Sequence, residues 1–134
     1  MVTKNREDYL RGLYVLEEQK HEIKSVDLAN YLKVSKPSVS EMIRQLQDEG
    51  LVSFKRYSNI RFTAKGRRAA EKLTSKHRII ELFLKEVLKL RKTDFHEEAH
   101  RLEHAFSDES IGQIKRLLGN PKKDPHGKPI PKVY

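Results

Sequence analysis

The sequence predicts a mainly α-helical protein whose helices are interrupted once by a short β-hairpin. Apolar residues recur at spacings of three and four along most of the 134 residues, which is the period of an amphipathic helix. Only the stretch 52–62 alternates apolar and polar residues in the manner of paired strands. The chain is long enough for two small lobes, and we expect these to be residues 1–63 and 64–134.

The chain carries a strong excess of basic residues. It contains 28 Lys and Arg against 19 Asp and Glu, a formal net charge of +9. This charge favours a polyanionic partner, most simply nucleic acid, although a basic protein of another function has the same signature. The absence of cysteine excludes disulfides and thiolate metal sites. No apolar run approaches a membrane span and no secretory signal opens the chain, so we expect a cytoplasmic protein without membrane association.

The first predicted helix runs from Glu7 to Gln19. Asp8 lies in its first turn, where an acidic side chain interacts favourably with the helix dipole. A second interpretation makes Asp8 a metal ligand at the start of the helix, and the segment alone does not decide between them. The apolar side of this helix consists of Leu10, Leu13, Tyr14 and Leu16.

Two short helices joined by a tight turn follow, as in a helix-turn-helix. We expect Ser25 to cap the first and Ser35 to cap the second, with Pro37 in its first turn and Gly50 at its end. The polar side chains of the second helix have the lengths that reach base edges and phosphates, although the surface helix of a bundle is also polar. The candidate DNA-binding residues here are Ser35, Lys36, Ser38, Ser40, Glu41, Arg44 and Gln45.

The alternating stretch predicts a β-hairpin with a basic tip, which forms a wing beside the second helix. Lys55, Arg56 and Arg61 are placed to reach phosphates, and Tyr57 either packs on the nucleic-acid backbone or serves the turn. A helix-turn-helix followed by a basic wing is a specific combination. It favours binding of double-stranded DNA over the protein-docking uses of the winged-helix fold.

A long helix is predicted from a Thr63 cap to about Leu90. Its apolar side is wider than one winged helix needs to cover, which favours a homodimer, since dimeric DNA-binding proteins match two-fold-related half-sites. His77 and Glu81 stand one turn apart on it, either as metal ligands or as an ordinary i,i+4 hydrogen bond. The apolar set is Ile79, Ile80, Phe83, Leu84, Val87 and Leu88.

The stretch 95–107 concentrates potential metal ligands. At roughly 100° per residue, His96, His100, Glu103 and His104 fall within an arc of about 100° on one helix face. Imidazole and carboxylate groups ligate divalent first-row metals, although a solvated polar face is the alternative. Ser107 or Asp108 begins a last helix ending at Gly119. The proline-rich tail that follows is either a packing strap or a loose end, with His126 as a turn residue.

Several motifs together resemble the metal-dependent transcriptional repressors related to the diphtheria toxin repressor and the manganese transport regulator. The motifs are EDYLRGLYVLEE, SKPSVSEMIRQLQDEGLVSF, TAKG, KHRIIELFL, EAHRLEH and DPHGKPIP. The resemblance implies an N-terminal winged helix-turn-helix followed by an all-helical metal-binding and dimerisation domain. It also implies one metal site of Asp8, His100, Glu103 and His104, and a second of His77, Glu81 and His96.

The chain departs from the family pattern at four places. Arg11 stands where the manganese branch has a glutamate ligand, so we expect no closely spaced pair of metals there. His100 replaces a cysteine or glutamate, and Asp124 stands where many relatives have cysteine. The 134 residues are too few for the SH3-like domain of the iron branch, so we expect a short form whose second site is completed by water.

We therefore expect a metal-activated repressor that binds operator DNA as a homodimer and controls metal homeostasis genes. Nitrogen and oxygen ligands with two carboxylates favour Mn²⁺ or Fe²⁺, with Zn²⁺, Co²⁺ and Ni²⁺ as possible substitutes. A metal-independent winged-helix regulator that senses a small molecule is the main alternative. A metalloenzyme is not expected, because the sequence offers no separate nucleophile and no Gly-rich phosphate loop.

Overall fold

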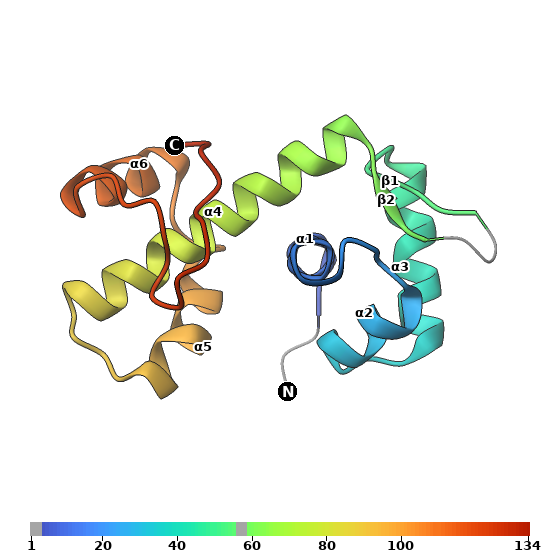
Figure 1. Cartoon of the computed structure of the whole chain (residues 1–134), viewed down its shortest axis with the longest axis horizontal. Helices are drawn as coiled ribbons and strands as arrows, with labels where there is room; N and C mark the ends of the chain where they lie inside the picture. Colours follow the sequence, from blue (N-terminus) through green and yellow to red (C-terminus); the bar gives the residue numbers. More distant parts are fainter. Residues whose placement is uncertain (1–3, 56–58) are drawn as a thin grey trace. The chain divides into compact units, whose positions relative to one another are not determined.

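The computed structural model describes residues 4–55 and 59–134, with residues 92–94 described by their backbone alone. The described residues form six helices and one two-stranded antiparallel sheet (Figure 1), which confirms the predicted fold class. In chain order the elements are α1 (Arg6–Lys20), α2 (Ser25–Leu32), α3 (Lys36–Asp48), β1 (Val52–Ser53), β2 (Arg61–Phe62), α4 (Ala64–Glu86), α5 (Lys92–Leu102) and α6 (Asp108–Leu117).

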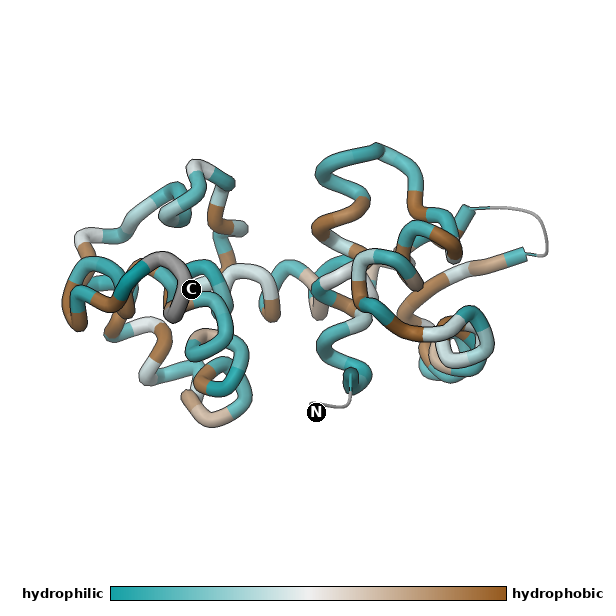
Figure 2. Tube along the Cα trace, turned by 90° about the horizontal axis from the view of Figure 1, so that it is seen from below, coloured by the Kyte–Doolittle hydropathy of each residue, from teal (hydrophilic) through white to brown (hydrophobic). Residues whose placement is uncertain are grey.

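The chain divides into two compact units, Met1–Glu71 and Lys72–Tyr134. The division falls inside α4, so this helix contributes its first turns to one unit and its remaining turns to the other. No helix of the described ranges is long and apolar enough to cross a membrane. Figure 2 shows the pattern behind this result, because hydrophobic residues occur along the trace in short stretches separated by hydrophilic ones.

The first unit begins with α1, which the sequence predicted to within one residue at each end. A capping box fixes its start. Asn5 Oδ1 accepts a hydrogen bond from the N–H of Asp8 at 3.1 Å, and Asp8 Oδ2 accepts one from the N–H of Asn5 at 2.8 Å. This arrangement satisfies backbone donors that the helix itself leaves open. Asp8 therefore has a structural role at the helix start, whatever else it does.

The helix-turn-helix forms as predicted, with one error at its first cap. Ser25 is the first helical residue of α2, and the cap position belongs to Lys24, whose side chain makes no capping bond. The prediction of a Ser25 cap is wrong because the helix starts one residue earlier than a serine cap requires. At α3 the predicted cap is confirmed: Ser35 Oγ accepts a hydrogen bond from the N–H of Ser38 at 3.2 Å.

The wing is anchored at its base. Val52 pairs with Phe62 and Ser53 with Arg61, and the N–H of Ile60 donates to the carbonyl of Ile23 at 2.8 Å. Of the predicted tip, Arg56 and Tyr57 lie outside the described residues. The apolar core of this unit includes Leu10, Leu13, Leu16, Ile23, Leu28, Leu32, Val39, Ile43, Leu46, Leu51, Val52 and Ile60.

The second unit is built from the later turns of α4, from α5 and α6, and from an ordered C-terminal segment. Helix α4 ends at Glu86, four residues before the predicted end, and Lys89 then takes a left-handed conformation with φ of 59°. The core consists of Ile79, Ile80, Leu82, Leu84, Phe95, Ala99, Ile111 and Ile130.

The segment 120–134 is the packing strap of the two alternatives that the sequence left open. The N–H of Ile130 donates to the carbonyl of Lys122 at 2.8 Å, and the N–H of Asp124 donates to the carbonyl of Lys128 at 2.8 Å. Burial of Ile130 in the core adds an apolar anchor to these hydrogen bonds. The strap therefore belongs to the folded core of the second unit, although its prolines keep it out of a helix.

Candidate metal centre and nucleic-acid interface

His77 of α4 contacts two buried carboxylates. Its Nε2 lies 2.8 Å from Oε1 of Glu81, and its Nδ1 lies 2.8 Å from Oε2 of Glu103. All three side chains are 4% exposed. A neutral imidazole donates through only one nitrogen, so two simultaneous hydrogen bonds require the imidazolium form. A metal bound at one nitrogen would leave the other N–H donating to a carboxylate, as metal-ligating histidines commonly do.

Glu81 presents a buried oxygen that lacks a hydrogen-bond partner among the described residues. This oxygen, Oε2, lies 3.7 Å from Nδ1 of His96 and 3.8 Å from Nδ1 of His126. A buried acceptor without a donor is costly, and a cation between it and the two imidazole nitrogens would remove that cost. The donor atoms of His77, Glu81 and His96 all lie within 4.8 Å of one another. The residues therefore fit a divalent metal.

The environment of Glu81 acts on its titration in opposite directions. Burial alone would raise the pKa of the Glu81 carboxyl. The close contact with His77 and the positive charges of His77 and His96 outweigh that effect and hold the pKa well below its ordinary value. The carboxylate is thus ionised at neutral pH, which is the form that a metal requires.

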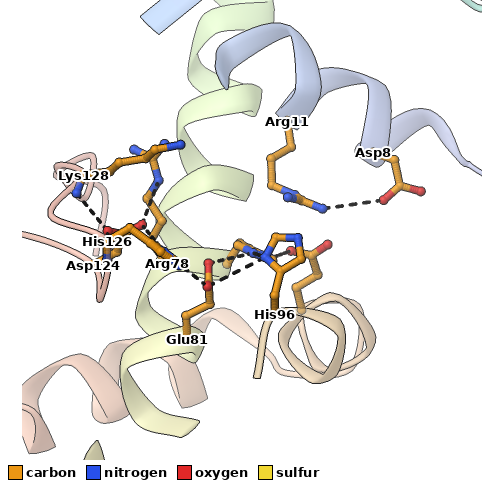
Figure 3. A network of polar contacts seen from close by, with 10 residues as sticks. Asp8, Arg11, Arg78, Glu81, His96, Asp124, His126 and Lys128 are labelled. Carbon is orange, nitrogen blue, oxygen red and sulfur yellow. Dashed lines mark hydrogen bonds and ion pairs between the residues drawn. The ribbon is translucent and has the colours of Figure 1, made fainter. Parts of the chain in front are cut away.

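The strap brings two further potential metal ligands close to Glu81, and the sequence prediction missed both. Glu81, Asp124 and His126 form a second group of donor atoms within 4.8 Å of one another, and Figure 3 shows the two strap residues beside Glu81. Nδ1 of His126 lies 3.8 Å from Oδ2 of Asp124. The prediction that His126 serves the turn is incomplete, because its ring points toward Glu81. The sequence pattern Asp-Pro-His was the available signal.

Arg78 holds the strap in place from α4. Its Nη1 donates to the carbonyl of Pro129 at 2.6 Å, and its Nε lies 3.8 Å from Oδ2 of Asp124. Asp124 Oδ1 accepts hydrogen bonds from the N–H groups of His126 and Lys128, both at 2.8 Å. Arg78 and Asp124 are buried, so they stabilise the strap with little screening by solvent.

His100, Glu103 and His104 lie at the end of α5. The helix stops at Leu102, so the expectation of one continuous helix through this stretch is wrong. Glu103 is the C-cap residue and keeps a helical backbone, with its N–H donating to the carbonyl of Ala99. The rings of His100 and His104 meet edge to face with centroids 5.4 Å apart, and His104 Nε2 lies 3.7 Å from Glu103 Oε1.

Glu103 connects the two predicted ligand sets of the second unit. One of its oxygens faces His104, and the other is held by His77. The fourth predicted ligand of the first set, Asp8, belongs to the first unit. Its Oδ1 lies 3.9 Å from Nη2 of Arg11 on the same helix, as the dashed line in Figure 3 marks.

The predicted DNA-binding face of α3 is exposed. The opposite face of α3 carries Val39, Ile43 and Leu46 and is buried in the first unit. On the wing, Lys55 and Arg61 are exposed as well. The exposed members of the α3 face are Ser35, Lys36, Ser38, Ser40, Glu41, Arg44 and Gln45.

A winged helix-turn-helix unit followed by a helical unit rich in nitrogen and oxygen ligands defines the class of metal-responsive DNA-binding proteins. Residues 1–60 match the family described as the N-terminal DNA-binding domain of iron-dependent repressors. Residues 63–132 match the family described as the metal-binding and dimerisation domain of the same repressors. The chain belongs to the iron-dependent repressor family.

Three relatives illustrate this membership. An uncharacterised HTH-type transcriptional regulator of Methanocaldococcus jannaschii is 37% identical over 113 residues, which cover 84% of this chain and 90% of the relative. The diphtheria toxin repressor of Corynebacterium diphtheriae is 34% identical over 125 residues, or 93% of this chain and 55% of that protein. The solved structure of the manganese regulator SloR is 40% identical with a TM-score of 0.86, over 98% of this chain and 61% of SloR.

A solved manganese-dependent transcriptional repressor in complex with manganese has a TM-score of 0.88 and is 38% identical. The match covers 96% of this chain and 59% of that one. The chain thus spans little more than half the length of several relatives, and 90% of the Methanocaldococcus jannaschii relative.

Proposed function

We propose that the protein is a metal-activated transcriptional repressor that binds operator DNA as a homodimer. The observation that carries the proposal is the buried Oε2 of Glu81, which has no hydrogen-bond partner among the described residues. It faces two imidazole nitrogens in a chain that also has an exposed helix-turn-helix face. A candidate metal site and a candidate DNA-binding face in one chain are typical of a regulator whose DNA binding depends on a metal. No catalytic activity is proposed.

Two metal sites are proposed. The first consists of Asp8, His100, Glu103 and His104, which carries over the ligand pattern of the family residue by residue. The second consists of His77, Glu81 and His96, with Asp124 and His126 in the place where water was expected. Iron-dependent repressors and manganese regulators are both among the relatives. Carboxylate and imidazole donors suit Mn²⁺ and Fe²⁺ alike, so we propose either ion as the activator.

Activation follows from the division of the ligands between two units. Asp8 belongs to residues 1–63, the proposed DNA-binding domain, and the other three belong to residues 64–134, the proposed metal-binding and dimerisation domain. A metal that all four ligands bind would restrain the two domains, and operator binding and metal binding would then strengthen each other. Such couplings are typically about 1–3 kcal/mol. Since the ligands must be deprotonated, activation weakens as pH falls through the range in which histidines titrate.

DNA contact is proposed for the exposed face of α3 and for the wing, through Lys55, Arg56 and Arg61. The hydrogen-bonding side chains of the helix are suited to base edges, and the basic side chains of the wing to phosphates. The expected signature is a steep loss of affinity with salt, because phosphate contacts release counterions. A DNA-binding regulator of this kind would act in the cytoplasm.

Dimerisation is proposed through the second unit. Among the described residues this unit exposes several large apolar side chains, of which Leu117 of α6 is 69% exposed and Leu88 is 52% exposed. Apolar side chains in such exposed positions favour burial against another copy. A two-fold dimer would present two copies of α3 to a palindromic operator.

The test begins with selection of a binding site from a random DNA pool in the presence of Mn²⁺. Fluorescence anisotropy then measures affinity for the selected site with Mn²⁺ and with a chelator. We expect at least tenfold tighter binding with the metal, which corresponds to about 1.4 kcal/mol. Equal affinities in both conditions would refute the metal switch. Intact DNA binding by an Asp8→Ala, His104→Ala double variant without metal dependence would instead favour a regulator that senses a small molecule.

A further inference from the structure

We propose that Arg11 is a built-in counter-ion of Asp8 that competes with the activating metal, and thereby raises the metal concentration at which the protein responds. This inference rests on the proposed role of Asp8 as a ligand. Arg11 itself cannot ligate a metal, but its charge would set the metal concentration at which the site fills.

The geometry of Asp8 divides its two oxygens between different partners. Oδ2 accepts the hydrogen bond from the N–H of Asn5 that completes the capping box, at 2.8 Å. Oδ1 faces Nη2 of Arg11 at 3.9 Å. The oxygen that the helix cap does not use is therefore the one that faces the guanidinium group of Arg11.

The position of Arg11 is fixed by the helix that carries both residues. Side chains at i and i+3 lie on the same face of an α-helix, so Arg11 stays beside Asp8 as long as α1 is folded. The side chain of Arg11 is 12% exposed and that of Asp8 is 2% exposed. With so little contact with solvent, their attraction is screened far less than that of a surface pair.

Arg11 places a positive charge beside the proposed ligand. Its guanidinium group has only N–H donors and no atom that could ligate a metal. A divalent ion at Oδ1 would approach a fixed positive charge and take over the oxygen that this charge stabilises. Both effects weaken metal binding, and both also oppose a second metal beside the first.

A matched control lies on the same helix. Arg6 forms an ion pair with Glu49 at 2.7 Å, with side chains that are 48% and 39% exposed. Arg6→Gln removes the same unit of charge from α1 as Arg11→Gln does, but from a solvated pair away from Asp8. The comparison separates the local effect of Arg11 from a general change in net charge.

The experiment measures Mn²⁺ binding by electron paramagnetic resonance of the free ion, together with the Tm of the metal-free protein. The relevant sites are those that Asp8→Asn weakens. We expect Arg11→Gln to bind Mn²⁺ about tenfold more tightly at these sites, in keeping with removal of a nearby like charge. We also expect a lower metal-free Tm, because Asp8 loses its counter-ion. Arg6→Gln should leave the Mn²⁺ affinity unchanged.

Arg11→Met provides a second variant with a similar aliphatic stem, and we expect it to bind Mn²⁺ as Arg11→Gln does. Arg11→Lys retains the charge and should stay close to the wild-type affinity. Unchanged or weaker Mn²⁺ binding by the two neutral variants, with Asp8→Asn still impaired, overturns the role of Arg11 alone. Wild-type Mn²⁺ binding by Asp8→Asn overturns the ligand assignment of Asp8, and the role of Arg11 with it.

Discussion

Nδ1 of His77 lies 2.8 Å from Oε2 of Glu103, and this contact joins helix α4 to the end of helix α5 inside the second unit. Because Nε2 of the same ring contacts Glu81 at 2.8 Å, one imidazole serves two carboxylates that are each 4% exposed. Removal of such a shared partner leaves two buried charges uncompensated, which is far more costly than removal of a surface ion pair.

We therefore expect His77→Ala to lower the free energy of unfolding of the metal-free protein by about 3–5 kcal/mol. His104→Ala is the matched control, since its side chain is 30% exposed and lies 3.7 Å from Glu103. That change should cost less than about 1 kcal/mol. Urea unfolding in the presence of a chelator measures both. Similar losses in the two variants would contradict the shared role of His77.

Gly66 of α4 is a position where no side chain fits. A Cβ there would lie 1.7 Å from the carbonyl oxygen of Leu51, so the backbone itself would have to move. We expect Gly66→Ala to cost more than about 3 kcal/mol in the unfolding of the first unit. Gly112→Ala is the control, because apart from its chain neighbours and the backbone of its own helix no atom lies within 4 Å of that Cβ. In the middle of α6 it should stabilise by about 0.5–1 kcal/mol. Thermal unfolding that ranked the two variants alike would refute this account.

We expect the ionisation of Asp108 to make the free energy of unfolding depend on pH in the acid range. The hydrogen bond from Lys72, at 2.5 Å, lowers the pKa of the Asp108 carboxyl, against the effect of burial and with help from the hydroxyl of Tyr134. In the unfolded chain an aspartate has a pKa of roughly 3.9, and in the folded protein the pKa of Asp108 is lower. The ionised carboxylate therefore stabilises the fold at pH values above roughly 3.9. This stabilisation is lost as the pH falls through the pKa of the folded state.

We expect Asp108→Asn to cost less than about 1 kcal/mol at pH 7, because the pair is about half exposed and screened by solvent. The difference between wild type and variant should shrink as the pH is lowered below roughly 4. Chemical unfolding at a series of pH values measures it. A difference that stayed constant or grew toward acid pH would show that the charge of Asp108 is not the cause.

Arg44 tests the proposed DNA-binding face of α3, where its side chain is exposed. We expect Arg44→Ala to lose about 1–3 kcal/mol of affinity for the selected operator, as loss of a base contact does, with relaxed preference at one position of the site. Lys20→Ala removes the same charge from an ion pair with Asp27 in the same unit, and should change affinity much less. Anisotropy titrations at several salt concentrations compare them. Equal losses would point to net charge instead of a specific contact.

Leu117 tests the dimer. We expect Leu117→Asp to shift the protein from dimer to monomer in analytical ultracentrifugation, because an exposed apolar side chain of α6 would become a charge buried at the interface. Val26→Asp, at a residue of α2 that is 45% exposed, introduces the same charge into the first unit and should leave the dimer intact. A monomeric wild type, or a dimeric Leu117→Asp variant, would place the interface elsewhere.

Much of the fold could be predicted because its signals are local. Apolar residues at spacings of three and four give α1 almost to the residue, and a serine cap with a proline in the first turn gives the start of α3. The sequence did not predict the end of α5 at Leu102. Glu103 is the C-cap residue and still has helical backbone angles, so the helical spacing of the side chains continues past the last helical residue. Periodicity in the sequence does not distinguish a last turn from its cap.

The surroundings of the site depend on contacts between distant residues, and these were harder to predict. Four histidines between residues 77 and 104 were predicted to be candidate ligands from their spacing, and the family resemblance divided them between two sites. The approach of His126 and Asp124 to Glu81 depends on how the strap folds back along α4, and Arg78 determines that path through Pro129. Neither spacing nor composition encodes such a path, since the strap has no repeating pattern.

The strap also determines the order in which the two units can fold during synthesis. Chains fold from the N-terminus as they leave the ribosome, and domains do so as units. All residues of the first unit emerge from the ribosome before Lys72 does, so the helix-turn-helix can close its own core at that point. Arg78 emerges soon afterwards, yet its partners Asp124 and Pro129 come much later. A nascent chain would therefore have a folded helix-turn-helix unit for some time before Asp124 and His126 could approach Glu81.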